Sequence, residues 1–237
     1  MFSKILTSAL FAGALAGLVA GVLQLIFVQP VLLHAELYET GALVHFGAEG
    51  ASGTATVAGG IDVLRDGLSL LFSMLVYTGY ALVLLPLMAV AERRGVAVTA
   101  RRGIVWGLAG FAAVQFAPAF SLAPEVPGVA AADVVLRQIW WWATVISAGA
   151  GLWLIAFSRN WLGVVGAVVL LLAPHLIGAP EPDGFTGPVP TELGATFAAR
   201  ALGVGAMAWG LLGLFAAVFW RSEQAASAKA STLQPRT

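Results

Sequence analysis

The chain has 237 residues, of which 59% are hydrophobic and only 10% are charged, and its mean hydropathy is +0.91. Soluble domains carry about 25% charged residues, so this composition excludes an ordinary soluble domain. The formal net charge is zero and gives no field that would attract nucleic acid. Several apolar runs reach the roughly 20 residues that cross a bilayer core, and they are continuous, whereas the strands of a membrane β-barrel alternate. We therefore predict an all-α integral membrane protein.

The spans are predicted in chain order as a bundle of six transmembrane helices, with five as the alternative. The first apolar run is too long for the core of a signal peptide, so we interpret it as an uncleaved span; a cleaved signal is the alternative. The predicted spans cover residues 3–28, 68–91, 103–120, 134–157, 161–177 and 193–220.

These spans form one predicted transmembrane domain over residues 1–221, with a long outer loop at 29–67. Within this loop, residues 34–39 resemble a helical extension of the first span, and the Gly-, Ala- and Thr-rich stretch 47–60 is expected to be mobile. Residues 222–237 are rich in Ala, Ser, Gln and Lys, and we expect a disordered cytoplasmic tail.

The basic residues predict the orientation, because cytoplasmic loops of membrane proteins carry an excess of Lys and Arg. With both termini cytoplasmic, the inner side holds Lys4, Arg93, Arg94, Arg101, Arg102, Arg159, Arg221, Lys229 and Arg236. The outer side keeps only Arg65, Arg137 and Arg200. This distribution favours a multi-pass protein of a bacterial cytoplasmic membrane.

Acidic residues show the opposite distribution, since only Glu92 and Glu223 lie on the inner side. The outer side holds Glu36, Glu39, Glu49, Asp62, Asp66, Glu125, Asp133, Glu181, Asp183 and Glu192. All three histidines, His34, His45 and His175, lie on or near the same side. An acidic outer face raises the local concentration of cations. An alternative interpretation, to which we give the same weight, is that the acidic residues have no role in attracting cations, because outer loops of bacterial membrane proteins are often acidic.

Several features of the spans predict helix packing. Ala9, Gly13, Gly17 and Gly21 recur every four residues and form one smooth helical stripe, which allows another helix to approach closely. Gln115 in the third span is also read as a packing residue, and Pro118 is expected to produce a simple kink.

Two charged groups are given structural roles. Asp133 and Arg137 stand four residues apart with the acid first, which predicts a structural ion pair on the fourth span. Arg200 lies inside the sixth span, and we expect it to extend toward the interface or to pair with an acid.

Four residues at the outer ends of the first, fifth and sixth spans are candidate metal ligands: His175, Glu192, His34 and Glu36. The chain has no cysteine, so a metal site must use imidazole, carboxylate or carbonyl groups, and this set suits Co, Ni, Zn or Fe in the divalent state. No two ligands share one helix at binding spacing, and each residue alone is better explained as a helix cap or an interfacial group.

Enzymatic chemistry is not predicted. The sequence contains no Walker A motif, no other phosphate-binding signature and no hydrolytic motif, so we expect neither an ATPase nor another enzyme. The alternatives that remain are a transport subunit and a non-transporting membrane scaffold or sensor whose outer polar residues only cap helices.

Two stretches resemble a known family. The first runs from Gly110-Phe-Ala-Ala-Val-Gln115-Phe-Ala-Pro118 through Leu122-Ala-Pro124-Glu125-Val-Pro127-Gly128 to Arg137-Gln138-Ile-Trp140-Trp141. The second is Pro174-His175-Leu-Ile-Gly178-Ala-Pro180-Glu-Pro182 with Val189-Pro190-Thr-Glu192-Leu193. Together with the Gly-rich first span and His34-Ala-Glu36, they resemble the CbtA family of predicted cobalt transporter subunits over nearly the whole chain.

This resemblance implies a membrane subunit for cobalt uptake that is linked to cobalamin biosynthesis. It implies a partner, CbtB, a small one-span membrane protein with a His-rich metal-binding tail. No cofactor is expected to be held permanently, and Co²⁺ (or Ni²⁺) would be the transported ion. The positions that match the family and could touch metal are His175, Glu192, Glu125, Asp133, His34 and Glu36. Family members are commonly described with five spans, whereas the sequence predicts six.

Overall fold

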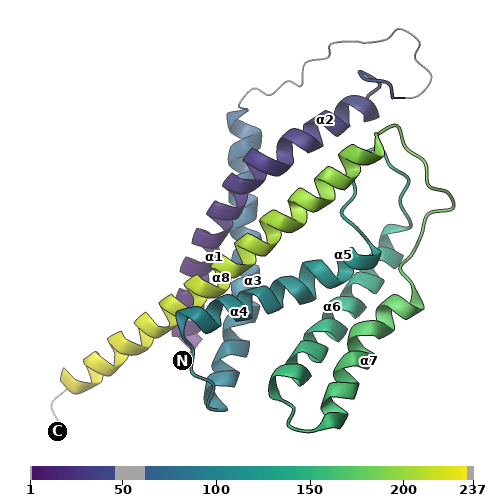
Figure 1. The fold of residues 1–237 in the computed structure, drawn as a ribbon. Coiled ribbons are helices and arrows are strands. Elements are labelled where there is room, and N and C mark those ends of the chain that lie inside the picture. Colours follow the sequence, from purple (N-terminus) through teal and green to yellow (C-terminus); the bar gives the residue numbers. More distant parts are fainter. Residues whose placement is uncertain (1, 46–61, 234–237) are drawn as a thin grey trace. The chain divides into compact units, whose positions relative to one another are not determined.

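A computed structural model describes residues 2–45 and 62–233, and every regular element in these ranges is helical (Figure 1). The first long helix is continuous and consists of α1 (Phe2–Leu23), the π-helical turn η1 (Gln24–Val28) and α2 (Gln29–Glu39). Next comes α3 (Val63–Arg93). A second composite helix joins α4 (Ala100–Phe111), the π-helical turn η2 (Ala112–Phe116) and α5 (Ala117–Ser121). The chain continues with α6 (Val134–Phe157), α7 (Trp161–Ile177) and α8 (Thr191–Leu233).

The predicted membrane class is confirmed. Five of the described helices are long and apolar enough to cross a bilayer, namely 2–39, 63–93, 100–121, 134–157 and 191–226. The sixth, Trp161–Ile177, is apolar but has only 17 residues. At a rise of 1.5 Å per residue it extends about 26 Å, slightly less than a typical hydrocarbon core of about 30 Å. Whether the described chain has five or six membrane spans therefore depends only on whether this 17-residue helix crosses the bilayer.

Two segments differ from the sequence prediction. The predicted helical extension over residues 34–39 is confirmed, since α2 ends at Glu39, but the outer loop is shorter than expected at its other end, where α3 already begins at Val63. The stretch expected to be mobile, 47–60, lies outside the described residues. The tail expected to be disordered is helical as far as Leu233, because its alanines favour the helix that α8 has already nucleated.

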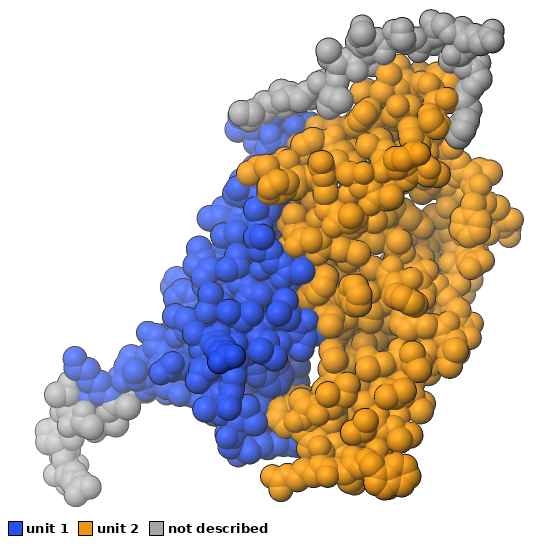
Figure 2. Space-filling model, viewed as in Figure 1, with its two compact units in different colours: residues 1–23, 62–110, 205–237 blue, residues 24–61, 111–204 orange. Residues whose placement is uncertain are grey.

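Two compact units make up the stretch that the sequence predicted as one transmembrane domain (Figure 2). Unit 1 contains residues 1–23, 62–110 and 205–237, and unit 2 contains residues 24–61 and 111–204. The division at 23/24 coincides with the start of η1, and the division at 110/111 lies one residue before η2.

In unit 1 the glycine stripe of α1 lies against α3. A Cβ atom placed on Gly13 would come 2.3 Å from the Cα of Thr78, and one on Gly17 would come 2.5 Å from the Cα of Met74. At Gly21 the nearest atom belongs to the Leu70 side chain. The two backbones thus approach as closely as the four-residue spacing predicts.

The rest of unit 1 joins α8 to α3 and α4. The Tyr80 ring stacks on Trp209 with a centroid distance of 4.6 Å. At the C-terminal end of α3, Glu92 accepts hydrogen bonds from Trp220 Nε1 (2.9 Å) and Gln224 Nε2 (2.8 Å). This carboxylate therefore fixes the end of α3 to α8.

In unit 2, α6 and α7 are neighbours, and two hydrogen bonds between them use backbone carbonyls. Trp140 Nε1 donates to the Pro174 carbonyl (3.2 Å), and Ser147 Oγ donates to the Leu170 carbonyl (2.5 Å). Trp140 is buried, and this hydrogen bond fixes its indole to α7.

A small hydrophobic core joins the loops and helix ends of unit 2. Its buried residues come from α2, from the segment between α5 and α6, and from the segment before α8. The members are Ala35, Val126 and Val189, with Tyr38, Val129, Leu193 and Phe197 packed around them. The loops at this end of unit 2 are therefore held by apolar packing.

Candidate functional site

His175 lies in the last turn of α7, and the local sequence explains its position. The helix ends because Gly178 adopts a positive φ of 94°, which ordinary residues adopt only with strain. Pro174, just before the histidine, is buried against α6. The imidazole is thus carried at a fixed helix end and is itself only partly buried.

Among the described residues, the imidazole of His175 has one hydrogen-bond partner. Its Nδ1 lies 2.8 Å from the Oγ of Ser121, the last residue of α5. Two aromatic rings surround it edge-on, Phe120 at 5.2 Å and Trp140 at 6.0 Å between centroids. These contacts fix the ring plane and engage Nδ1, while no hydrogen bond to Nε2 occurs within the described residues.

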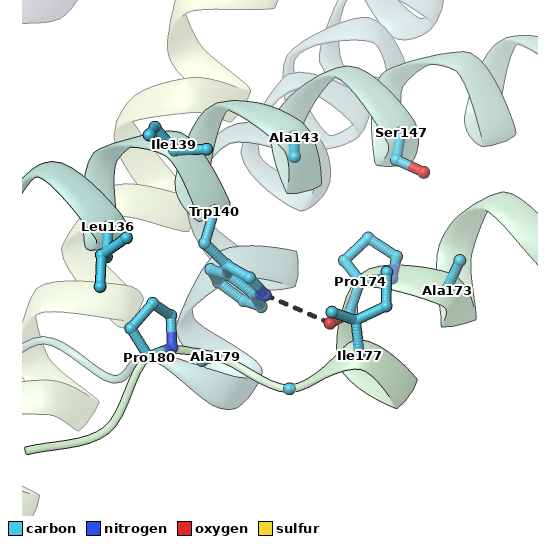
Figure 3. Close-up of a pocket in the computed structure, with 11 residues that line it drawn as sticks. Leu136, Ile139, Trp140, Ala143, Ser147, Ala173, Pro174, Ile177, Ala179 and Pro180 are labelled. Atoms are coloured by element: carbon cyan, nitrogen blue, oxygen red, sulfur yellow. Dashed lines mark hydrogen bonds between the residues drawn. The ribbon is translucent and has the colours of Figure 1, made fainter.

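An open groove of about 560 Å³ lies beside this histidine between α6 and α7 (Figure 3). Leu136, Ile139 and Trp140 line it from α6, and Pro174 and Ile177 from α7. In Figure 3 the Trp140 indole points across the groove to the Pro174 carbonyl. The lining is almost entirely apolar, so the groove itself offers few ligands to a metal ion.

The other predicted ligands lie on α2 and at the start of α8. The His34 ring lies 5.7 Å from Tyr38 on the same helix, and Glu192 Oε2 lies 3.3 Å from Thr191 Oγ1. The core of unit 2 brings together Ala35 and Leu193, which adjoin His34, Glu36 and Glu192 in the sequence. The helices that carry these three ligands therefore meet.

The structure does not gather the predicted ligands into one cluster. Among the described residues, no three His, Asp or Glu side chains lie close enough together to hold a metal ion. His175 has Ser121 as its partner, while α2 and α8 form a separate contact. A shared site for His175, Glu192, His34 and Glu36 stays a prediction.

The predicted ion pair between Asp133 and Arg137 is wrong. Asp133 caps the N-terminus of α6, where its Oδ1 accepts from the backbone N–H groups of Val135 (2.9 Å) and Leu136 (3.0 Å). Arg137 instead pairs with Glu125 at 2.7 Å. The acid therefore lies before the first helical turn and binds the free N–H groups there, which leaves the guanidinium to a carboxylate from the preceding loop.

Arg200 also has a partner other than the expected acid. Its Nη1 donates to the carbonyl oxygen of Phe27 at 3.1 Å. Phe27 belongs to the π-helical turn η1. Such a turn interrupts the regular backbone bonding, so a carbonyl becomes available to the arginine.

Ser121 is the site residue that sequence reasoning missed. It is 54 positions away from His175, and a lone serine at a helix end carries no signal of a distant partner. The only available hint was that both residues stand at predicted outer ends of spans.

Apolar spans, few charges within them and polar side chains at the helix ends define a multi-pass helical membrane protein. Comparison with family models is more specific. The chain belongs to the CbtA family, described as "Probable cobalt transporter subunit (CbtA)", whose model matches residues 2–221. Searches of curated proteins and of solved structures gave no match.

Proposed function

We propose that this chain is the membrane subunit of a bacterial cobalt uptake system linked to cobalamin biosynthesis. The family match over residues 2–221 is the observation that carries the proposal. The description as a subunit supports a second component, which we propose to be a small CbtB-like membrane protein with a His-rich tail. The proposed location is the cytoplasmic membrane, with both termini inside, as the distribution of basic residues favours.

In the proposed entry site, His175 is the first ligand. When Nδ1 donates its hydrogen to Ser121 Oγ, the lone pair of a neutral imidazole remains on Nε2, the nitrogen without a hydrogen-bond partner in the described chain. Imidazole with carboxylate suits Co²⁺ and Ni²⁺. Glu192, His34 and Glu36 would supply the remaining groups, and their convergence on His175 requires movement of the outer segments.

The proposed driving force is the membrane potential. Inward movement of a divalent cation gains about 4.6 kcal/mol per 100 mV, at roughly 2.3 kcal/mol per charge. At about 1.4 kcal/mol per tenfold, this supports an accumulation of roughly a thousandfold or more. A chain without a nucleotide-binding motif can therefore take part in uptake, with the cobalt ion as cargo.

The site is tested by radiocobalt uptake in the native host with the chromosomal copy replaced by variants. His175→Ala combined with Glu192→Ala is expected to reduce the initial rate at low cobalt by at least tenfold, the scale on which metal-site partners act. His45→Ala is the matched control, since this histidine is outside the proposed set. An unchanged rate in the double variant, at equal amounts of protein in the membrane, contradicts the site.

One observation favours a second function, a non-transporting scaffold or sensor. The groove beside His175 is apolar, and no group of three potential ligands occurs among the described residues. On this alternative, the outer polar residues only cap helices and fix loops. A host strain without the gene would then take up cobalt at the wild-type rate.

A further inference from the structure

The third span carries a buried side-chain oxygen, Gln115 Oε1, that accepts no hydrogen bond from the described residues. Gln115 lies in η2, five residues of π-helix between α4 and α5. Its Oε1 atom is wholly buried, and no hydrogen-bond donor reaches it from the described residues. A buried, unpaired amide oxygen destabilises a protein, because it has lost its hydrogen bonds to water. Its presence here calls for a role that simple packing does not provide.

The backbone around Gln115 is also short of donors. The N–H of Ala117 bonds to the carbonyl of Ala112, five residues earlier, which is the π-helical pattern. The next residue, Pro118, has no N–H group, so a carbonyl one turn before it lacks its usual helical partner. The predicted simple kink is therefore a π-helical turn, a feature often found at functional sites.

The neighbouring helix does not supply the missing donor. The η2 turn packs against α6, whose buried polar side chains include Thr144. Thr144 Oγ1 donates its hydrogen to the Trp140 carbonyl (2.9 Å), and Ser147 Oγ donates to the Leu170 carbonyl. Both hydroxyl hydrogens are thus committed to backbone carbonyls of α6 and α7.

We infer that Gln115 Oε1 and the backbone carbonyl left without its helical partner before Pro118 form an intramembrane oxygen site for a divalent cation in transit. The inference rests on the proposed transport function. It adds a second place where the ion would contact the protein, at Gln115, six residues before Ser121 on the same composite helix. Interrupted helices of transporters bind ions through such released carbonyls. The oxygens are neutral, which suits a transit site, because a passing ion must also leave.

Two substitutions at this position give opposite expectations. Gln115→Leu keeps the volume but removes the oxygen, so the initial rate of uptake should fall by about tenfold or more, the scale of metal-site partners. Its thermal stability should be equal to or above that of the wild type, because an unpaired buried oxygen is replaced by an apolar group. Gln115→Glu adds a negative charge, so the half-saturating concentration and the maximal rate should both fall as the ion is held too tightly.

The experiment measures uptake of radioactive cobalt, nickel and manganese in the native host carrying each variant, together with unfolding of the purified proteins. Gln138→Leu is the matched control, because this glutamine is exposed on α6, and its uptake should equal that of the wild type. Wild-type rates for Gln115→Leu overturn the inference and leave the proposed function intact. A loss of uptake together with a loss of stability also overturns it, since a packing role then suffices. A wild-type chain that transports none of the three ions contradicts the proposed function, and the inference with it.

Discussion

At the scale of residues, Ser121 is the hydrogen-bond partner of the His175 imidazole. Its Oγ lies 2.8 Å from Nδ1, and in the tautomer in which Nδ1 donates, Nε2 keeps a lone pair and can act as a ligand. Hydrogen bonds of this kind fix the tautomer and orientation of metal-binding histidines. Ser121 is therefore proposed as a positioning residue for the entry site.

Ser121→Ala should raise the half-saturating cobalt concentration by about tenfold while the maximal rate of uptake changes little. Ser121→Thr retains the hydroxyl and should restore most of the affinity. Ser147→Ala is a useful comparison, because it removes another interhelical hydroxyl of unit 2 that is not part of the proposed site. Equal affinity in Ser121→Ala and wild type would contradict the positioning role, as would a loss confined to the maximal rate.

Sequence reasoning at this scale found the polar residues but not their partners. The spacing of Asp133 and Arg137 fits a helical ion pair, yet Asp133 lies before the helix and caps it, so Glu125 takes the arginine. Arg200 was expected to extend toward the interface or to pair with an acid; its side chain is exposed and binds the Phe27 carbonyl. These partners depend on tertiary contacts that local spacing does not contain.

At the scale of elements, the close contact between α1 and α3 was predictable. Small residues every four positions are sufficient for a smooth face, and Gly13, Gly17 and Gly21 occupy that face in the structure. The π-helical turns were not predictable, because Pro118 is equally compatible with an ordinary kink. Which of the two forms depends on the packing of the neighbouring helices.

Gly17→Ala should destabilise the protein by about 1–3 kcal/mol, because the added Cβ meets backbone atoms that must shift. The clash involves the Cα of Met74 at 2.5 Å and the carbonyl oxygen of Ser73 at 2.6 Å. Gly79→Ala on α3 is the matched control, since nothing lies within 4 Å of its added Cβ. Thermal unfolding in detergent measures both. A Gly17→Ala protein as stable as Gly79→Ala would show that the two helices do not touch there.

At the scale of the whole molecule, composition alone determined the class, and the continuous apolar runs located the five helices that are long enough to span a bilayer. Apolar runs of this length have few other structures available to them, because lipid cannot hydrogen-bond a free backbone. The division into two units was beyond sequence reasoning, since it follows from which helices pack together. The helical tail was mispredicted because a polar composition was given more weight than its alanine content.

The predicted orientation can be measured with single cysteines, since the chain contains none of its own. Ala97→Cys, in the exposed turn between α3 and α4, should react with a membrane-impermeant thiol reagent only after permeabilisation. Asp183→Cys, in the exposed segment before α8, should react in intact spheroplasts. The reverse pattern would place the acidic face in the cytoplasm and remove its proposed role in attracting cations.

The central claim is that this chain takes part in cobalt uptake. The most direct measurement is the initial rate of radiocobalt accumulation in the native host without the gene, compared with the same strain after the gene is restored. We expect a low rate without the chain, a full rate with it, and loss of that difference when the membrane potential is collapsed. Equal rates in the two strains at limiting cobalt would contradict a role of this chain in cobalt uptake.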